Sequence, residues 1–261
     1  MNPVQLEELM AHAVRAARAA SAAILEVWHS GDFEQEKKSD DSPLTRADRA
    51  AHQVIIDLLH PAGLPVLSEE GMDIPFEVRR MWSFFWMVDP LDGTREFLNR
   101  NGDFTVNIAL MEKNRPVAGV VAVPVEHKLY LGGPAWGAWS MGQGSERMPL
   151  PTAERIALHQ PGIRVVASRS HRDERTEACI AALDRPILMS RGSSLKFMLL
   201  AEGKADFYPR FAPTMEWDTA AAQAILEATG TGVRAEENGE QLRYNKEDLR
   251  NPFFSCLAGN I

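Results

Sequence analysis

The chain has 261 residues, a formal net charge of −8 at pH 7 and a hydrophobic fraction of 45%. These values are typical of a globular chain with one large or two modest domains and a sizeable core. The negative charge argues against a general nucleic-acid-binding protein, which normally presents a basic face. Only Cys179 and Cys256 are present, too few for a disulfide framework, so we expect a reducing compartment.

We expect neither an export signal nor a membrane-spanning segment. Residues 1–8 are acidic and lack the basic start and apolar centre of a signal peptide. No apolar run approaches the roughly 18 to 20 residues that a membrane span needs. We therefore expect a cytoplasmic protein. Peripheral association with the inner membrane stays open, although no basic amphipathic segment supports it.

Two helices are predicted at the start of the chain. Apolar residues recur at helical spacing between Leu6 and Trp28 and predict a long, Ala-rich helix that ends at Gly31-Asp32. The segment Thr45-Arg46-Ala47-Asp48 has the form of a capping box. It predicts a second helix, which Pro61 should stop.

The remaining pattern changes character near residue 160. Before it, strand-like runs at residues 84–88, 104–111, 118–123 and 128–131 predict a sheet with antiparallel turns. The Gly- and Pro-rich stretch 132–151 is the weakest part of the pattern. After it, strands and helices alternate, at residues 164–168, 174–183, 186–189, 194–202, 205–208 and 218–229. This predicts an N-terminal α+β subdomain over residues 1–160 and a C-terminal α/β subdomain over residues 161–261. We expect the ligand site in the cleft between them.

Three acidic clusters stand at the ends of apolar segments. They are Glu69-Glu70, the pair Asp89 and Asp92, and Asp218. Each has an ordinary structural alternative: a solvated turn for the glutamates, an Asx-turn for the aspartate pair and a helix N-cap for Asp218. Three such clusters together are what a binuclear site with oxygen ligands requires.

The aspartate pair offers the densest set of oxygen atoms. Pro90 and Gly93 predict a turn, so the carboxylates of Asp89 and Asp92 and the carbonyl of Leu91 can converge on one point. Mg²⁺ prefers hard oxygen ligands of this kind and leaves positions for water and a substrate phosphate.

These segments resemble a known family. The strings LSEEG, DPLDGTREF and EWDTAAAQAI resemble the three signature segments of the inositol monophosphatase superfamily of Mg²⁺-dependent, lithium-sensitive phosphatases. The strings KSDDSPLTRADRAAH, NGDFTVNIAL, ASRSHRD and GSSLKFMLLAEGKADFYPRF resemble its CysQ branch, the 3'(2'),5'-bisphosphate nucleotidases. Together they run from about residue 37 to residue 229. The resemblance implies an α-β-α-β-α sandwich, with α+β and α/β halves and the metals in the cleft.

The resemblance also implies roles for the acidic residues. Two or three Mg²⁺ ions would be bound by Glu69, Asp89, the Leu91 carbonyl, Asp92 and Asp218, with Glu70 just outside the direct ligands. Catalysis would use Glu69, Asp48 and Thr94. In related enzymes the aspartate matching Asp48 pairs with the threonine of the D-G-T motif, whose hydroxyl holds the attacking water. The alternative for Asp48 is closure of the capping box alone.

Candidates for substrate contacts lie on several segments. They are Leu91, Asp92, Gly93, Thr94, His171, Ser193, Ser194, Lys196, Arg210 and Asp218. A helix should begin at Gly93-Thr94, so that its amides would face the reacting phosphate. Ser193, Ser194 and Lys196 would receive a second phosphate, the alternative being a serine N-cap with a solvated lysine. His171 alone would be an ordinary loop or cap histidine, and it is a candidate because the string ASRSHRD resembles the nucleotide-contact segment of bisphosphate nucleotidases.

The function expected from the resemblance is hydrolysis of the 3'-phosphate of 3'-phosphoadenosine 5'-phosphate, which yields AMP and phosphate. A phosphatase of inositol or sugar phosphates is the nearest enzymatic alternative, and it would need no adenine site. A non-catalytic regulator that binds metal or nucleotide is the alternative of another class. Against it, the chain retains Asp48, Glu69, Asp89, Asp92, Thr94 and Asp218.

Overall fold

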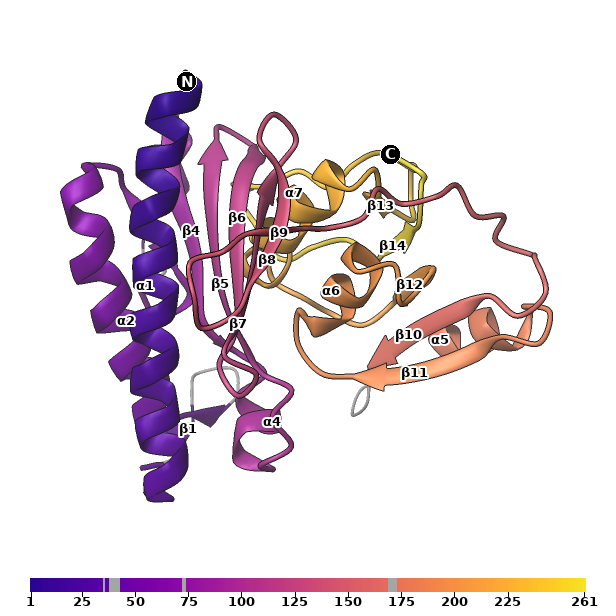
Figure 1. The fold of residues 1–261 in the computed structure, drawn as a ribbon, viewed down its shortest axis with the longest axis horizontal. Helices are drawn as coiled ribbons and strands as arrows, with labels where there is room; N and C mark the ends of the chain where they lie inside the picture. The colour runs from indigo at the N-terminus through magenta and orange to yellow at the C-terminus, as the bar shows by residue number, and fades with distance from the viewer. Residues whose placement is uncertain (35, 38–42, 72–73, 169–172) are drawn as a thin grey trace.

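The chain folds into alternating layers of helices and sheets (Figure 1). The structure, a computed structural model, describes residues 1–34, 36–37, 43–71, 74–168 and 173–261. Three hydrophobic cores lie between successive layers and give the order α-β-α-β-α. The fold class predicted from the sequence is therefore confirmed.

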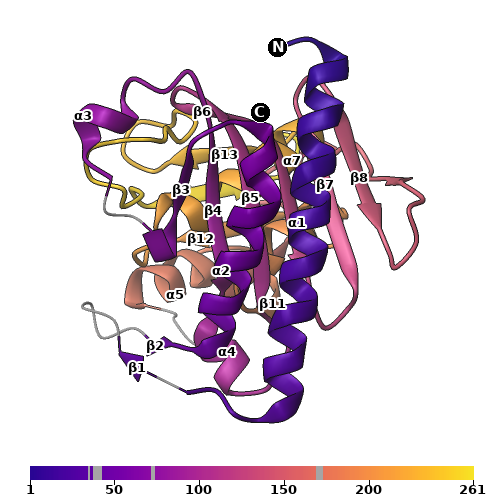
Figure 2. The ribbon, with the colours of Figure 1, turned by 90° about the vertical axis from the view of Figure 1, so that its left-hand side faces the viewer.

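The outer layer consists of α1 (Pro3–Ser30) and α2 (Arg46–Leu59), which lie side by side across the first sheet (Figure 2). The helix α1 ends at Gly31, whose positive φ of 75° suits glycine. Half of its buried residues are alanine, and these small side chains let α1 approach the sheet closely. At α2 the predicted capping box is present, with Thr45 and Asp48 as its two members.

The first sheet has seven strands in the order β3-β4-β5-β6-β7-β8-β9. Their bounds are β3 (Val66–Ser68), β4 (Phe84–Asp92), β5 (Thr105–Glu112), β6 (Arg115–Val123), β7 (Lys128–Gly133), β8 (Gly137–Met141) and β9 (Met148–Pro149). β3 runs parallel to β4, and the other neighbouring pairs are antiparallel. Because β3 and β4 are parallel, Glu69, which follows β3, and Asp89 and Asp92, which end β4, lie at the same end of this sheet.

The middle layer consists of α6 (Leu195–Ala201) and α7 (Ala220–Ala228), which pack between the two sheets. The second sheet has the order β11-β10-β12-β14-β13. Its strands are β10 (Arg164–Ser168), β11 (Ile187–Arg191), β12 (Phe207–Arg210), β13 (Gly232–Ala235) and β14 (Phe254–Leu257). The helix α5 (Glu174–Ala181) covers its other face through a small third core.

Short elements complete the chain. They are β1 (Glu36–Lys37), β2 (Pro43–Leu44), α3 (Phe76–Arg79), α4 (Thr94–Leu98) and the 3₁₀ helices η1 (His60–Ala62), η2 (Glu69–Gly71) and η3 (Glu216–Asp218). Within the part of the chain that the structure describes, no helix is long and apolar enough to cross a membrane.

Several element predictions need correction. The strand predicted at 84–88 continues to Asp92, because a register shift against β5 absorbs the irregularity that Pro90 introduces. The weak stretch 132–151 contains β8 and β9. The last helix is divided into η3 and α7, with Thr219 as the N-cap of α7, so Asp218 is not that helix's N-cap. The strands β13 and β14 were not predicted.

Candidate active site

A cleft of about 620 Å³ opens between the ends of the two sheets. One wall comes from the end of β4 and from α4, and the other from the β11–α6 turn, β12 and η3. Its lining includes Asp92, Gly93, Thr94, Ser193, Ser194, Lys196, Arg210 and Asp218. The chain passes between the two sheets from β9 to β10, and the division into subdomains near residue 160 stays a prediction.

Three carboxylates converge at the inner end of this cleft. Asp89, Asp92 and Asp218 each place an oxygen within 4.8 Å of the oxygens of the other two. Asp89 Oδ1 also accepts a hydrogen bond from the amide of Leu91 at 2.9 Å, the Asx-turn considered as an alternative. Asp218 Oδ2 accepts from the amide of Met215 at 2.9 Å. Asp89 and Asp218 therefore each have one oxygen held by their own turn.

The crowding of these carboxylates changes their protonation. Burial raises the pKa of Asp89 well above its usual range, and the charges of Glu69, Asp92 and Asp218 raise it further. The pKa of Asp218 is raised for the same reasons, by burial first and then by Asp92 and Glu69. Glu69 is also within hydrogen-bond reach of Asp89. A set of hard oxygen ligands whose mutual repulsion is unfavourable suits a divalent cation such as Mg²⁺.

Asp92 is held by residues of β5 and by Ser194, which directly precedes α6. Ser194 Oγ lies 3.0 Å from Asp92 Oδ2 and 2.8 Å from the carbonyl oxygen of Asp218. Asn107 Nδ2 donates to Ser194 Oγ at 3.0 Å, and Thr105 Oγ1 lies 3.4 Å from Asp92 Oδ2. Ser194 is buried and its hydroxyl makes no cap hydrogen bond at α6. Its contacts orient Asp92 rather than leave a hydroxyl free for a phosphate.

A hydrogen bond joins Thr94 and Asp48. Thr94 Oγ1 donates to Asp48 Oδ1 at 3.2 Å and also lies 3.3 Å from the carbonyl oxygen of Leu91. Asp48 Oδ2 accepts from the amide and the hydroxyl of Thr45, at 2.7 and 2.6 Å. Asp48 is 1% exposed. The contacts that the two interpretations of Asp48 require are therefore both present, one on each carboxylate oxygen.

Positive charge lies on the wall opposite Thr94. Lys196 is 5% exposed, and its Nζ donates to the carbonyl of Ser193 at 2.6 Å, so the solvated lysine considered as an alternative is excluded. Burial, with a further contribution from Arg210, lowers the pKa of Lys196 to about 8. Arg210 Nη2 donates to the carbonyl of Pro213 at 3.2 Å, whereas its buried Nε has no protein partner. The hydroxyl of Ser193, also on the cleft, is likewise buried without a partner.

Gly93 lies where the two walls of the cleft meet. It precedes α4 with a positive φ of 94°, and a side chain there would stand 3.1 Å from the carbonyl oxygen of Asp103 and 3.3 Å from Ser193 Cβ. Only glycine fits this conformation and this contact without strain. The helix predicted to begin at Gly93-Thr94 is present and has five residues.

Other sequence-predicted residues lie apart from the carboxylate cluster or outside the described residues. Glu70 is in η2, where its charge acts on His52 of α2, which contacts Ser68 at 3.0 Å. His171 lies outside the described residues. Sequence reasoning assigned no role to Asn107. The sequence does place two polar residues, Thr105 and Asn107, before the apolar run of β5. Because they are two residues apart in a strand, they lie on one face, and both are buried.

Comparisons with known proteins agree with this geometry. The sequence model of the inositol monophosphatase family matches residues 5–253. The 3'(2'),5'-bisphosphate nucleotidase CysQ of Salmonella typhimurium is 45% identical over 245 residues, which are 91% of this chain and 95% of that protein. The crystal structure of CysQ from Bacteroides thetaiotaomicron, a bacterial member of the inositol monophosphatase family, superimposes with a TM-score of 0.85, 45% identity and 98% coverage of both chains. The extragenic suppressor protein suhB from Bartonella henselae shares the fold, with a TM-score of 0.76, 23% identity, and 97% and 94% coverage.

Proposed function

Because the chain belongs to the inositol monophosphatase family, we propose that it is a Mg²⁺-dependent 3'(2'),5'-bisphosphate nucleotidase that converts 3'-phosphoadenosine 5'-phosphate to AMP and phosphate. The observation that carries the proposal is the convergence of Asp89, Asp92 and Asp218 beside the Thr94–Asp48 hydrogen bond. The first feature suits cation binding and the second suits the positioning of a water molecule. The 45% identity to a relative named for this activity supports the choice of substrate class.

In this proposal, two or three Mg²⁺ ions are held by Glu69, Asp89, the Leu91 carbonyl, Asp92 and Asp218. The bound ions would neutralise charge on the phosphate and lower the pKa of the attacking water. Two supports make the ligand set rigid. The Asx-turn fixes Asp89, and Ser194 with Asn107 fixes Asp92. Glu70 lies outside the direct ligands.

The contribution of Thr94 follows from the direction of its hydrogen bond. When its single proton points to the Asp48 carboxylate, the lone pairs of Thr94 Oγ1 can accept a hydrogen bond from a water molecule in the cleft. The backbone amide of Thr45 holds the other oxygen of the Asp48 carboxylate in place. The pair can therefore orient a water molecule and accept a hydrogen bond from it as that water attacks.

The opposite wall would select the substrate. Lys196 and Arg210 supply positive charge where a second phosphate can lie, and the unpartnered hydroxyl of Ser193 and Nε of Arg210 supply donors. Gly93 and Thr94, which line the cleft, would lie beside the reacting phosphate. His171 remains a candidate nucleotide contact from the sequence alone. A cytoplasmic location stays part of the proposal.

The test is phosphate release from 3'-phosphoadenosine 5'-phosphate with Mg²⁺ and with a chelator. Turnover should require Mg²⁺ and fall with lithium. Asp89→Asn should lose at least about a hundred-fold in activity, the scale of a failed metal site. Absence of turnover by the wild-type protein, with Mg²⁺ still bound, would favour the non-catalytic regulator. Turnover by Asp89→Asn above about a tenth of wild type would contradict the metal assignment.

A further inference from the structure

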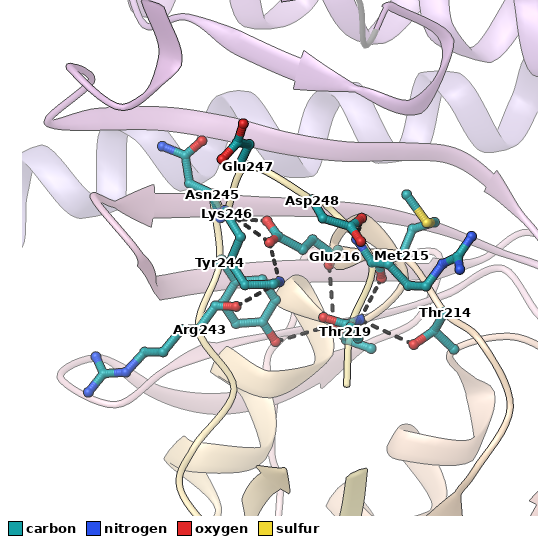
Figure 3. A network of polar contacts seen from close by, with 12 residues as sticks. Thr214, Met215, Glu216, Thr219, Arg243, Tyr244, Asn245, Lys246, Glu247 and Asp248 are labelled. Carbon is teal, nitrogen blue, oxygen red and sulfur yellow. Dashed lines mark hydrogen bonds and ion pairs between the residues drawn. The ribbon is translucent and has the colours of Figure 1, made fainter. Parts of the chain in front are cut away.

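Glu216 lies two residues before Asp218 in η3, and it is completely buried without lining the cleft. Its carboxylate is held by a loop of residues 243–251 (Figure 3). Lys246 Nζ forms an ion pair with it, and the backbone amides of Asn245 and Lys246 donate to the same carboxylate. Burying a charge is unfavourable unless it is paired and hydrogen-bonded. The arrangement therefore holds the loop tightly against η3.

The same loop fixes the backbone on both sides of Glu216. The carbonyl of Leu249 accepts from the amide of Glu216 at 2.9 Å. Asn251 Nδ2 donates to the carbonyl of Met215 at 2.7 Å and lies 3.1 Å from Thr219 Oγ1. Met215 is the residue whose amide binds the Asp218 carboxylate. The position of that carboxylate thus depends on backbone that the loop holds in place.

Arg79 supports the loop from its other side. This buried residue of α3 donates through Nη1 to Asn245 Oδ1 at 2.9 Å and through Nη2 to the carbonyl of Glu247 at 2.9 Å. Asn245 Nδ2 returns a hydrogen bond to the carbonyl of Arg79 at 2.9 Å. The segment of α3 follows η2, which carries Glu69. The loop therefore contacts both the segment that follows Glu69 and the segment that contains Asp218.

We propose that Glu216 is a positioning residue that, through Lys246 and the loop supported by Arg79, sets where the Asp218 carboxylate stands relative to Asp89 and Asp92. The proposal rests on the function proposed above, because it assumes that Asp218 binds the metal. Groups that orient metal ligands from outside typically change metal affinity by about 10- to 100-fold when removed. A role confined to folding would change stability and leave the affinity of the folded protein alone.

The experiment is calorimetric titration of Mg²⁺ into the metal-free full-length protein. Glu216→Gln keeps the shape and removes the charge, and it should weaken Mg²⁺ binding by about 10- to 100-fold. Lys246→Met should act in the same direction, and Lys246→Arg should restore the affinity. The KM for substrate at saturating Mg²⁺ should stay within about two-fold of wild type. If Glu216→Gln does not fold, Lys246→Met decides, because Lys246 is one-third exposed and tolerates replacement better.

Asp206→Asn is the matched control. Asp206 is a buried carboxylate paired with Arg164 and lies outside the cleft, so its loss should lower the unfolding temperature without changing Mg²⁺ affinity. The proposal is overturned if Glu216→Gln and Lys246→Met lower the unfolding temperature and leave Mg²⁺ affinity within about two-fold of wild type. Asp218→Asn distinguishes failure of the positioning role of Glu216 from failure of the metal assignment. If it too leaves Mg²⁺ affinity unchanged, the metal assignment in the proposed function fails, and the role of Glu216 fails with it.

Discussion

Three acidic residues of the site, Asp48, Asp89 and Asp218, each make a local structural contact with one oxygen and leave the other for the site. Asp48 closes the capping box of α2 with Oδ2 and binds Thr94 with Oδ1. Asp89 Oδ1 accepts from Leu91 N, and Asp218 Oδ2 accepts from Met215 N. A carboxylate has about four acceptor positions. Structural and functional interpretations of one aspartate are therefore compatible, and local sequence could not choose between them.

The Thr94–Asp48 contact predicts coupled kinetic losses. Thr94→Ala and Asp48→Ala should each lower kcat by about 10²-fold or more with little change in KM, as expected when a group that orients water is lost. Because the two act as one unit, the double variant should be hardly worse than either single variant. Steady-state kinetics of the three variants at saturating Mg²⁺ provides the measurement.

Thr45→Ala is the control for the capping role of Asp48. It removes the cap and keeps the contact with Thr94, so it should cost about 0.5 to 2 kcal/mol of stability with little loss of rate. Additive losses in the double variant, or a stability defect without a rate defect in Asp48→Ala, would limit Asp48 to the capping box.

Lys196 predicts a pH dependence of bisphosphate binding. Burial lowers the pKa of Lys196 from 10.5 to about 8, so the unliganded enzyme loses this charge as the pH rises through about 8. The KM for 3'-phosphoadenosine 5'-phosphate should rise over the same range. Lys196→Ala should lose this dependence and reduce kcat/KM by about 10- to 150-fold, the value of a charge-assisted contact.

Inositol 1-phosphate is the control substrate, because it has no second phosphate. Its kcat/KM should barely respond to Lys196→Ala. An equal loss on both substrates would mean that Lys196 supports the fold or the reacting phosphate.

At the scale of elements, long periodic segments could be predicted and short or irregular ones could not. The helix α1 and the strand β10 match their expected positions, because an amphipathic stripe and an apolar run are strong local signals. The strands β13 and β14 have four residues each and pair antiparallel with each other at one edge of the second sheet. Such short strands depend on tertiary pairing, which local sequence does not encode.

Packing of α7 on β6 depends on Gly119. A side chain there would stand 2.3 Å from the carbonyl oxygen of Ala221 and 2.7 Å from its Cα, so the helix would have to move. Gly119→Ala should cost about 1 to 3 kcal/mol or more, as overpacking does. Thermal unfolding measures the loss, with a shift of about 2 to 4 °C per kcal/mol.

Gly142→Ala is the matched control, because Gly142 is exposed and an added Cβ meets no atom within 4 Å. Its stability should stay within about 0.5 kcal/mol of wild type. Equal stability of the two variants would contradict the close contact between α7 and β6.

At the scale of the whole molecule, the site combines segments that lie far apart in the sequence. Sequence resemblance suggested Glu69, Asp89, Asp92 and Asp218 as ligands, and three of these four form the observed cluster of carboxylate oxygens. The groups that support the ligands could not be assigned in the same way. Asn107 reaches Asp92 and Ser194 only because β5 pairs with β4 in one register, and Glu216 meets its partners only through a loop without regular structure.

The apoprotein should become less stable as the pH rises. The pKa of Asp89 and of Asp218 is raised above the ordinary value of 3.8, first by burial. The stability linked to a raised pKa is fully present below 3.8 and is lost as the pH rises through the folded-state pKa. Asp89→Asn should therefore unfold at a higher temperature than the metal-free wild type at pH 7, and the difference should vanish near pH 4.

Mg²⁺ should reverse this order at pH 7, because a ligand that binds only the folded state stabilises it. Thermal unfolding with Mg²⁺ and with a chelator gives both comparisons. If metal-free Asp89→Asn is less stable than wild type at pH 7, the buried Asp89 carboxylate does not destabilise the metal-free fold, and the prediction is wrong.

The proposed nucleotidase activity is best tested by a competition panel with Mg²⁺. The panel compares kcat/KM for 3'-phosphoadenosine 5'-phosphate, inositol 1-phosphate and fructose 1,6-bisphosphate. If Lys196 and Arg210 hold a second phosphate on the nucleotide, 3'-phosphoadenosine 5'-phosphate should exceed inositol 1-phosphate by at least about 10-fold, the lower value of one charge-assisted contact. It should also exceed the sugar bisphosphate. Equal or greater kcat/KM for inositol 1-phosphate or fructose 1,6-bisphosphate would contradict the nucleotidase and favour a phosphatase of inositol or sugar phosphates.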